Sequence, residues 1–90
     1  MIEWKTFGTA EWAVLSAGAL RVRLFVADTG WWTVKMTSDL PGILGGFFEM
    51  QGHAIAREDS KNEAADAARL MLGELAAALA ELKAKVEEGR

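Results

Sequence analysis

The sequence predicts one α+β domain, a four- to five-stranded antiparallel β-meander with one long C-terminal α-helix packed on one of its faces. Residues 1–56 alternate apolar and polar positions in short runs separated by glycine-containing turns, which is the pattern of half-buried strands. Residues 60–88 place apolar residues three and four positions apart in an alanine-rich run, which is the pattern of an amphipathic helix. A chain of 90 residues buries enough surface for one hydrophobic core, so residues 1–90 form a single domain.

The clearest strands are 20–27 and 31–36, which form the predicted central hairpin. They are separated by a three-residue loop that ends in Gly30, a residue suited to a positive φ. A loop of this length places two rows of cross-strand pairs on opposite faces of the sheet. The pairs on the core face are Val22–Met36, Leu24–Val34 and Val26–Trp32, and the pairs on the outer face are Arg23–Lys35 and Phe25–Thr33.

Three further strands are predicted at 2–7, 11–17 and 47–56. The segment 37–46 separates the last of them from the central hairpin, and it contains Pro41 and three glycines, which predicts a loop. Ile43 and Leu44 lie at the tip of this loop. Because exposed loops often carry binding residues, these two apolar side chains are candidates for contact with a partner.

The predicted helix, 60–88, begins with a capping box, Ser60-Lys61-Asn62-Glu63. In this motif the Ser60 hydroxyl accepts a hydrogen bond from the Glu63 amide, while the Glu63 carboxylate accepts one from the Ser60 amide. The apolar stripe that follows comprises Ala64, Ala68, Met71, Leu75, Leu79, Leu82 and Val86. We expect this stripe to pack on the sheet.

The predicted helix is longer than the strands that it would cover. It spans about 42 Å, whereas a seven-residue strand spans about 23 Å. The helix must therefore overhang the sheet, bend, or pack its far end on another surface. Leu79, Leu82 and Val86 lie on this far part, where they cover a sheet edge, belong to turns that fray, or form a homodimer seam or a partner groove.

Residue composition argues against an enzyme. The chain has no cysteine and one histidine, His53, and none of its serines lies in a nucleophile-elbow sequence. Glu49, Gln51 and His53 share one face of a predicted strand, but Glu49 and His53 are about 13 Å apart along it. That separation is too large for two ligands of one metal ion, which lie about 2 Å from it. We therefore expect no catalytic residues, no metal and no cofactor.

Charge and hydropathy patterning predict a soluble, cytoplasmic protein with no membrane contact. The absence of cysteine fits a reducing compartment. The start of the chain lacks the basic and apolar segments of a signal peptide. The apolar stretch 13–27 is interrupted by Arg21 and Arg23, so it does not span a bilayer. The net charge of −3 argues against non-specific nucleic-acid binding.

The outer face of the central hairpin carries the main candidate partner-binding residues, which are Arg21, Arg23, Phe25, Trp31 and Lys35. Basic and aromatic side chains interleaved on a sheet can bind single-stranded nucleic acid. An exposed tryptophan such as Trp31 is also a frequent anchor of protein interfaces, whereas Trp32 is expected in the core. Arg23 and Lys35 oppose each other as like charges, which is unfavourable unless an anion, or the carboxylate of Glu11 or Glu49, lies between them.

Two resemblances to known families follow from these motifs. The stretch 60–68 resembles the final helix of double-stranded-RNA-binding domains, which begins with a Ser-Lys-Lys-x-Ala-Lys type of run that grips phosphates. Lys61 matches that run, whereas Asn62 and Ala65 stand where the family has lysines. The first helix of that family has no counterpart among the predicted elements.

The second resemblance covers nearly the whole chain. It consists of a tryptophan near the start, Gly18-Ala19-Leu20-Arg21-Val22, Gly30-Trp31-Trp32-Thr33-Val34, Gly52-x-Ala54 and the Glu63-Ala64 helix start. This pattern resembles small uncharacterised β-meander-plus-helix proteins encoded by phages and prophages, a group that includes anti-CRISPR proteins. The resemblance implies a non-enzymatic accessory protein that binds a host protein and modulates or inhibits it.

Three functional hypotheses therefore arise from the sequence. The first is a phage-type interaction protein that uses the outer sheet face together with Ile43 and Leu44. The second is a nucleic-acid-binding module that uses the same basic and aromatic face. The third is a structural homodimer formed through Leu79, Leu82 and Val86.

Overall fold

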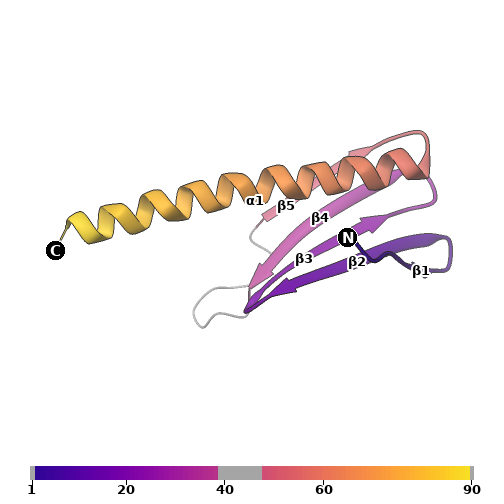
Figure 1. Ribbon diagram of the computed structural model, residues 1–90. Helices are drawn as coiled ribbons and strands as arrows, with labels where there is room; N and C mark the ends of the chain where they lie inside the picture. The colour runs from indigo at the N-terminus through magenta and orange to yellow at the C-terminus, as the bar shows by residue number, and fades with distance from the viewer. Residues whose placement is uncertain (1, 39–47, 90) are drawn as a thin grey trace.

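A computed structural model describes residues 2–38 and 48–89 and shows a five-stranded antiparallel sheet with one long helix (Figure 1). The strands are β1 (Lys5–Phe7), β2 (Ala10–Ala17), β3 (Leu20–Val26), β4 (Trp31–Ser38) and β5 (Phe48–His53), and the helix is α1 (Arg57–Glu88). The strands lie in the sheet in chain order, so each one pairs with its neighbour in sequence. This arrangement confirms the predicted meander-plus-helix fold.

The loop between β3 and β4 determines the register of the two central strands. Its last residue, Gly30, has a φ of 93°, and the Ala27 amide donates to the Trp31 carbonyl oxygen at 2.8 Å. The resulting pairs are Val22–Met36, Leu24–Val34 and Val26–Trp32 on one face, and Arg23–Lys35 and Phe25–Thr33 on the other. These are the pairs that the loop length predicts.

The hydrophobic core lies between α1 and one face of the sheet, which we name the inner face. Alternate strand residues supply most of its bulk, among them Leu24, Val34 and Met36, which are fully buried. The helix contributes mainly alanines, whose small side chains allow its backbone to approach the strands closely. α1 packs on β3, β4 and β5, so the opposite face, which we name the outer face, is left bare by the helix (Figure 1).

The start of the helix differs from the prediction. α1 begins at Arg57 rather than Ser60, its N-cap residue is Ala56, and no side chain caps it, so the predicted capping box is wrong. Ser60 is instead buried in the first turn, where its hydroxyl donates to the Gly30 carbonyl oxygen at 2.7 Å. The same oxygen accepts the Ala54 amide at 3.2 Å. Ser60 therefore ties the first helical turn to the β3–β4 loop and to the end of β5.

Further polar contacts hold the first half of α1 against the inner face. The Trp32 indole N–H donates to the Glu63 carboxylate at 3.2 Å, so Glu63 bonds to β4 and not to the helix start. Glu11 of β2 pairs with Lys61 at 2.7 Å and with Arg57 at 3.7 Å. These contacts join the first two turns of α1 to β4 and β2 on the inner face.

The second half of α1 projects beyond the sheet. Its 32 residues span about 48 Å, and the molecule measures 53 × 22 × 22 Å. Every described residue of α1 from 76 onward is exposed, and Figure 1 shows this part extending past the strand ends. Of the three predicted outcomes, the overhang is therefore the one observed. Within residues 2–38 and 48–89, no helix is both long and apolar enough to cross a membrane.

We expect the overhang to contribute little to the stability of the fold. Truncation after Ala78 should change the free energy of unfolding by less than about 1 kcal/mol, because the removed side chains do not pack on the sheet. Urea unfolding followed by tryptophan fluorescence measures this difference. Amide hydrogen exchange on the full chain is a second measurement. We expect fast exchange after Ala80 and slow exchange around Ala64. Slow exchange from Leu79 to Val86 together with a dimeric mass would instead support the homodimer seam.

Candidate functional site

The outer face of the sheet brings together the basic and aromatic residues that the sequence singles out. Strand pairing places Arg21, Arg23, Phe25, Trp31 and Lys35 on this face, and all five are exposed. The two tryptophans separate as predicted, since Trp31 is 56% exposed and Trp32 is 7% exposed. The β1–β2 and β2–β3 pairings add Lys5, Phe7, Trp12 and Val14 to the same face. We name these nine residues together the basic-aromatic face.

Trp12 and Val14 escaped the sequence analysis because β2 is apolar on both of its faces, and Lys5 and Phe7 escaped it because their side of the sheet follows from the pairing of β1 with β2. Trp12, Ala13, Val14 and Leu15 form an uninterrupted apolar run, so the period of two does not reveal which of them point outward. The signal that could have found them is the two-residue loop between β2 and β3. That loop pairs Ala17 with Leu20, and counting back from this pair places Val14 and Trp12 beside Arg23 and Phe25.

Positive charge is concentrated on the basic-aromatic face, although the chain carries a net charge of −3. The cations on the face are Lys5, Arg21, Arg23 and Lys35, whereas Glu49 is the one acidic residue that the described strands place there. Elsewhere in the described part, the basic side chains pair with carboxylates, namely Arg57, Lys61, Arg69, Lys83 and Lys85. No described carboxylate forms an ion pair with Lys5, Arg23 or Lys35. Among the described residues, these three charges are therefore not neutralised by an ion pair.

Arg23 and Lys35 lie directly opposite each other, as predicted. Glu49 faces Lys35 from β5 on the same face, so it can moderate the repulsion between the two cations. Glu11 cannot, because it lies on the inner face opposite Val26, and the prediction that it could sit between Arg23 and Lys35 is wrong. Opposed like charges with one carboxylate beside them favour the approach of a further anionic group.

An apolar hollow opens in the basic-aromatic face between β1, β2 and β3. It has a volume of about 380 Å³ and is lined by Phe7, Trp12, Val14, Arg23 and Phe25. The Lys5 ammonium lies 5.5 Å from the centroid of the Trp12 ring, which is a cation–π distance. The hollow therefore combines an apolar floor with two cations and suits an apolar side chain that lies next to a negative charge.

A pair of rings in contact lies at the β4–β5 side of the face. The ring centroids of Trp31 and His53 are 4.9 Å apart, with the planes inclined by 57°. The His53 Nε2 atom lies 2.9 Å from the Thr29 carbonyl oxygen, so a hydrogen bond orients the ring. Residues 2–38 and 48–89 contain no group of three His, Cys, Asp or Glu side chains placed to hold a metal ion. The contact that the structure shows for the His53 ring on this face is therefore with Trp31.

The other predicted site residues lie apart from this face. Ile43 and Leu44 fall outside the described residues. Leu79, Leu82 and Val86 are exposed on the α1 overhang, away from the outer face of the sheet. Lys61, the match to the phosphate-gripping run of double-stranded-RNA-binding domains, is 17% exposed, pairs with Glu11 and lies over the Trp4 ring. A phosphate would have to displace Glu11 to reach its ammonium group.

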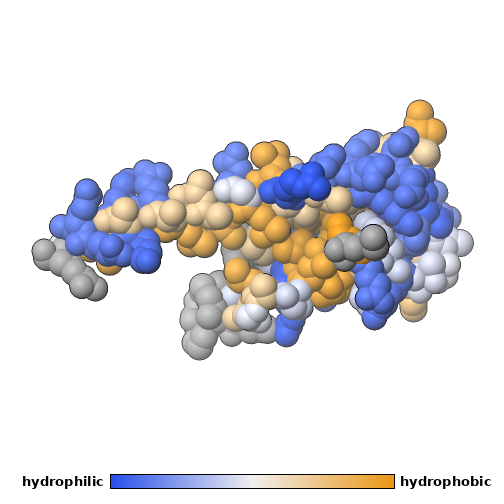
Figure 2. Space-filling view, viewed as in Figure 1, coloured by the Kyte–Doolittle hydropathy of each residue, from blue (hydrophilic) through white to orange (hydrophobic). Residues whose placement is uncertain are grey.

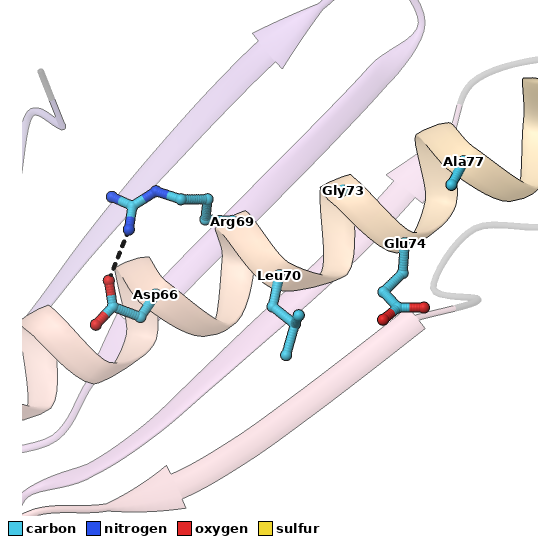
Figure 3. Close-up of a pocket in the computed structure, with 6 residues that line it drawn as sticks. All are labelled: Asp66, Arg69, Leu70, Gly73, Glu74 and Ala77. Carbon is cyan, nitrogen blue, oxygen red and sulfur yellow. Dashed lines mark hydrogen bonds and ion pairs between the residues drawn. The ribbon is translucent and has the colours of Figure 1, made fainter.

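A further hollow, of about 520 Å³, runs along the surface of α1 (Figure 3). Gly73 is one of its lining residues, and a Cβ placed there would meet no neighbouring atom within 4 Å. Figure 3 shows Arg69 turned toward Asp66, to which it donates at 2.8 Å, while Leu70 and Glu74 project from another side of the helix. The charges that line this hollow are thus partly paired with each other, and it is a groove of one helix rather than a cleft between elements.

Comparisons with known proteins add no relative to this picture. No family model, no curated protein and no solved structure matches the chain.

Proposed function

We propose that this chain is a non-catalytic interaction protein that docks its basic-aromatic face on an acidic surface of a partner protein. The observation that carries the proposal is the grouping of four cations around exposed aromatic side chains on a sheet face that no described element covers. Complementary charge steers association and sets the orientation of the partners. Tryptophan and arginine side chains supply much of the binding energy in interface centres.

The overall charge of the chain favours an acidic protein over a nucleic acid as the partner. The chain carries thirteen acidic residues against ten basic ones, and Glu49 lies on the basic-aromatic face itself. A long polyanion extends beyond the basic-aromatic face and is repelled by the acidic residues elsewhere on the chain. A local acidic patch on a protein contacts only the four cations of the face. Single-stranded nucleic acid is the second candidate, because aromatic rings and cations share one sheet face.

The resemblance to phage-encoded meander-plus-helix proteins extends the proposal to the kind of partner. Under this extension the partner is a protein of the host cell, and docking modulates or inhibits it, as expected for a member of the group that includes anti-CRISPR proteins. Occupation of a surface is sufficient for such an effect, so the proposal requires no catalytic residue.

The double variant Arg23→Gln/Lys35→Gln tests the proposal. Each chain is immobilised and incubated with a nuclease-treated host extract, and the amount of retained partner is measured. We expect the double variant to retain at least about tenfold less partner than the wild-type chain, because two unpaired cations are removed. The matched control is Lys83→Gln/Lys85→Gln, which removes the same charge from the α1 overhang and should retain the partner at the wild-type level. Equal retention by both variants would contradict the proposal.

Titration with a single-stranded oligonucleotide separates the two candidates. We expect no binding even at low salt. Phosphate contacts strengthen as the salt concentration falls, so a salt-dependent interaction that Arg23→Gln/Lys35→Gln removes would replace the proposal with a nucleic-acid-binding module.

A further inference from the structure

The second half of β2 has an open edge. β1 is three residues long and pairs only with residues 10–12 of β2. Before Lys5 the chain leaves the sheet (Figure 1). Ile2 and Trp4 pack against the hydrophobic core, and Lys61 of α1 lies over the Trp4 ring. Residues 13–17 therefore have β3 on one side and no described strand on the other.

The backbone groups exposed along this edge belong to Val14 and Ser16. The two-residue loop between β2 and β3 makes Ala17 and Leu20 a hydrogen-bonded pair, and bonded and non-bonded pairs alternate from there along the strand. Ala17, Leu15 and Ala13 thus direct their backbone groups toward β3, whereas Val14 and Ser16 direct theirs away from it. Within the described residues, no backbone hydrogen bond outside the sheet ladder involves these two residues.

Each face of the sheet has an apolar hollow beside this edge. The hollow of the basic-aromatic face lies on the outer side and includes Val14. A second hollow, of about 170 Å³, lies on the inner side, where Leu15, Leu20 and Leu72 line it. Figure 2 shows the hydrophobic surface that gathers there, between α1 and the sheet. Leu15 and Leu72 are both exposed, so apolar surface on this side remains to be covered.

An added β-strand would satisfy the backbone groups and fill both hollows at once. Successive side chains of a strand point to opposite faces, so a strand beside residues 13–17 places alternate side chains on the outer and the inner side. We infer that the partner contributes an extended segment that joins the sheet at the β2 edge, which is binding by β-augmentation. The inference rests on the proposed function and names the part of the partner that docks.

Charge defines the chemistry of this segment. The segment continues the line of β1, so its outward-facing side chains lie beyond Lys5 and beside Val14. Val14 pairs with Arg23 of β3 on the same face. Glu or Asp at these positions meets two cations that lack an ion pair among the described residues. Its inward-facing side chains meet Leu15 and Leu72, so they are apolar. Outward-facing and inward-facing residues therefore alternate along the segment. The outward-facing ones are acidic or apolar, and the inward-facing ones are apolar.

A second copy of this chain fits the edge less well than an acidic segment does. Two β2 edges paired about a twofold axis would place both outer faces on the same side of a continuous sheet. That arrangement brings the Lys5 and Arg23 side chains of the two copies toward each other. Like charges at this distance disfavour the pairing.

The opposite edge of the sheet provides the matched control position. The Ala54 amide donates to the Gly30 carbonyl oxygen, and bonded and non-bonded pairs alternate from there along β5. Gly52 and Met50 therefore direct their backbone groups toward β4, whereas Gln51 directs its backbone groups away from the sheet. Gln51 and Ser16 are both exposed and both lie on the outer face of an edge strand. The hollow beside β5 is lined by two glutamates, which disfavours an acidic segment there.

A random linear peptide library selected on the immobilised full-length chain supplies the probe. We expect the enriched peptides to alternate acidic and apolar residues, and a bound peptide to slow amide exchange of Val14 and Ser16 by about tenfold or more, with no change at Gln51. Ser16→Pro removes an outward-facing N–H without touching the β2–β3 ladder, so peptide affinity should fall about tenfold or more. Gln51→Pro should leave peptide affinity unchanged.

The outcomes separate the inference from the proposed function. Peptide binding that Arg23→Gln/Lys35→Gln removes but Ser16→Pro preserves, with no protection of Val14 and Ser16, overturns the strand inference and keeps the proposed function. Binding that neither variant affects overturns both. Leu15→Glu, which places a like charge in the inner hollow and leaves the backbone intact, should show the same loss if Ser16→Pro does not fold. A library without any binder, or protection of Val14 and Ser16 in a dimeric free chain, also overturns the inference.

Discussion

Replacing Gly30 with alanine is expected to lower the free energy of unfolding by roughly 3–5 kcal/mol, because two costs add at one position. Gly30 has a φ of 93°, which a residue with a Cβ rarely adopts. A Cβ at this position would also collide with the Ala54 carbonyl oxygen. Relief of the collision must move the backbone of β5 and disturb the bonds that Ala54 and Ser60 donate to Gly30. Urea unfolding followed by tryptophan fluorescence measures the loss.

Gly18→Ala is the matched control for this variant. Gly18 also has a positive φ, 59°, but a Cβ there would have no neighbour within 4 Å. Its expected cost is therefore the conformational part alone, about 1 kcal/mol. Equal losses at the two positions would show that the contact of Gly30 with Ala54 contributes nothing to stability.

Trp32→Ala is expected to cost about 3–5 kcal/mol of stability, the range for removal of a buried aromatic side chain. The Trp32 ring packs over Gly52 so closely that a Cβ on Gly52 would collide with it. Its indole N–H also donates to Glu63 of α1. Truncation therefore opens a cavity between β4, β5 and the helix and removes one helix–sheet hydrogen bond. Thermal and urea unfolding monitored by circular dichroism measure the loss, since the variant lacks one tryptophan fluorophore.

Trp31→Ala makes the same chemical change at the adjacent position, on the opposite face of the sheet. We expect it to change stability by less than about 1 kcal/mol, because the side chain is exposed. We expect it to weaken partner binding by about tenfold or more, as loss of an aromatic anchor does. A stability loss as large as that of Trp32→Ala would contradict the division of the sheet into a core face and a binding face. Unchanged partner binding would remove Trp31 from the interface.

The central hairpin shows what sequence reasoning can predict reliably. Polar and apolar residues alternate along β3 and β4, and the length of the intervening loop sets their register, so both faces follow from local information. Five residues of the basic-aromatic face could therefore be placed correctly. Trp12 and Val14 could not, because β2 is apolar on both sides and its partners decide which side is outward. Lys5 and Phe7 could not, because the side on which they lie follows from the pairing of β1 with β2.

The helix start shows why a local motif can mislead. Ser60 and Glu63 have the spacing of a capping box, but the Ser60 side chain bonds to the β3–β4 loop and the Glu63 side chain to β4 instead. Ser60 donates to a carbonyl thirty residues earlier in the chain, and that acceptor comes into reach only after the β3–β4 loop and α1 have packed. A buried tertiary hydrogen bond thus replaces the local one, and the helix begins one turn earlier, at Arg57.

The sequence by itself determined the order of the strands, the pairing of β3 with β4 and the presence of a helix too long for its sheet. All of these follow from periodicity, loop length and chain length, which are local properties. Only the tertiary structure decided that Ile2 and Trp4 leave the sheet to cover its inner face. The β2 edge is open for this reason, since burying these two side chains against the core shortens β1. Among the described residues, no strand then lies beside the backbone groups of Val14 and Ser16.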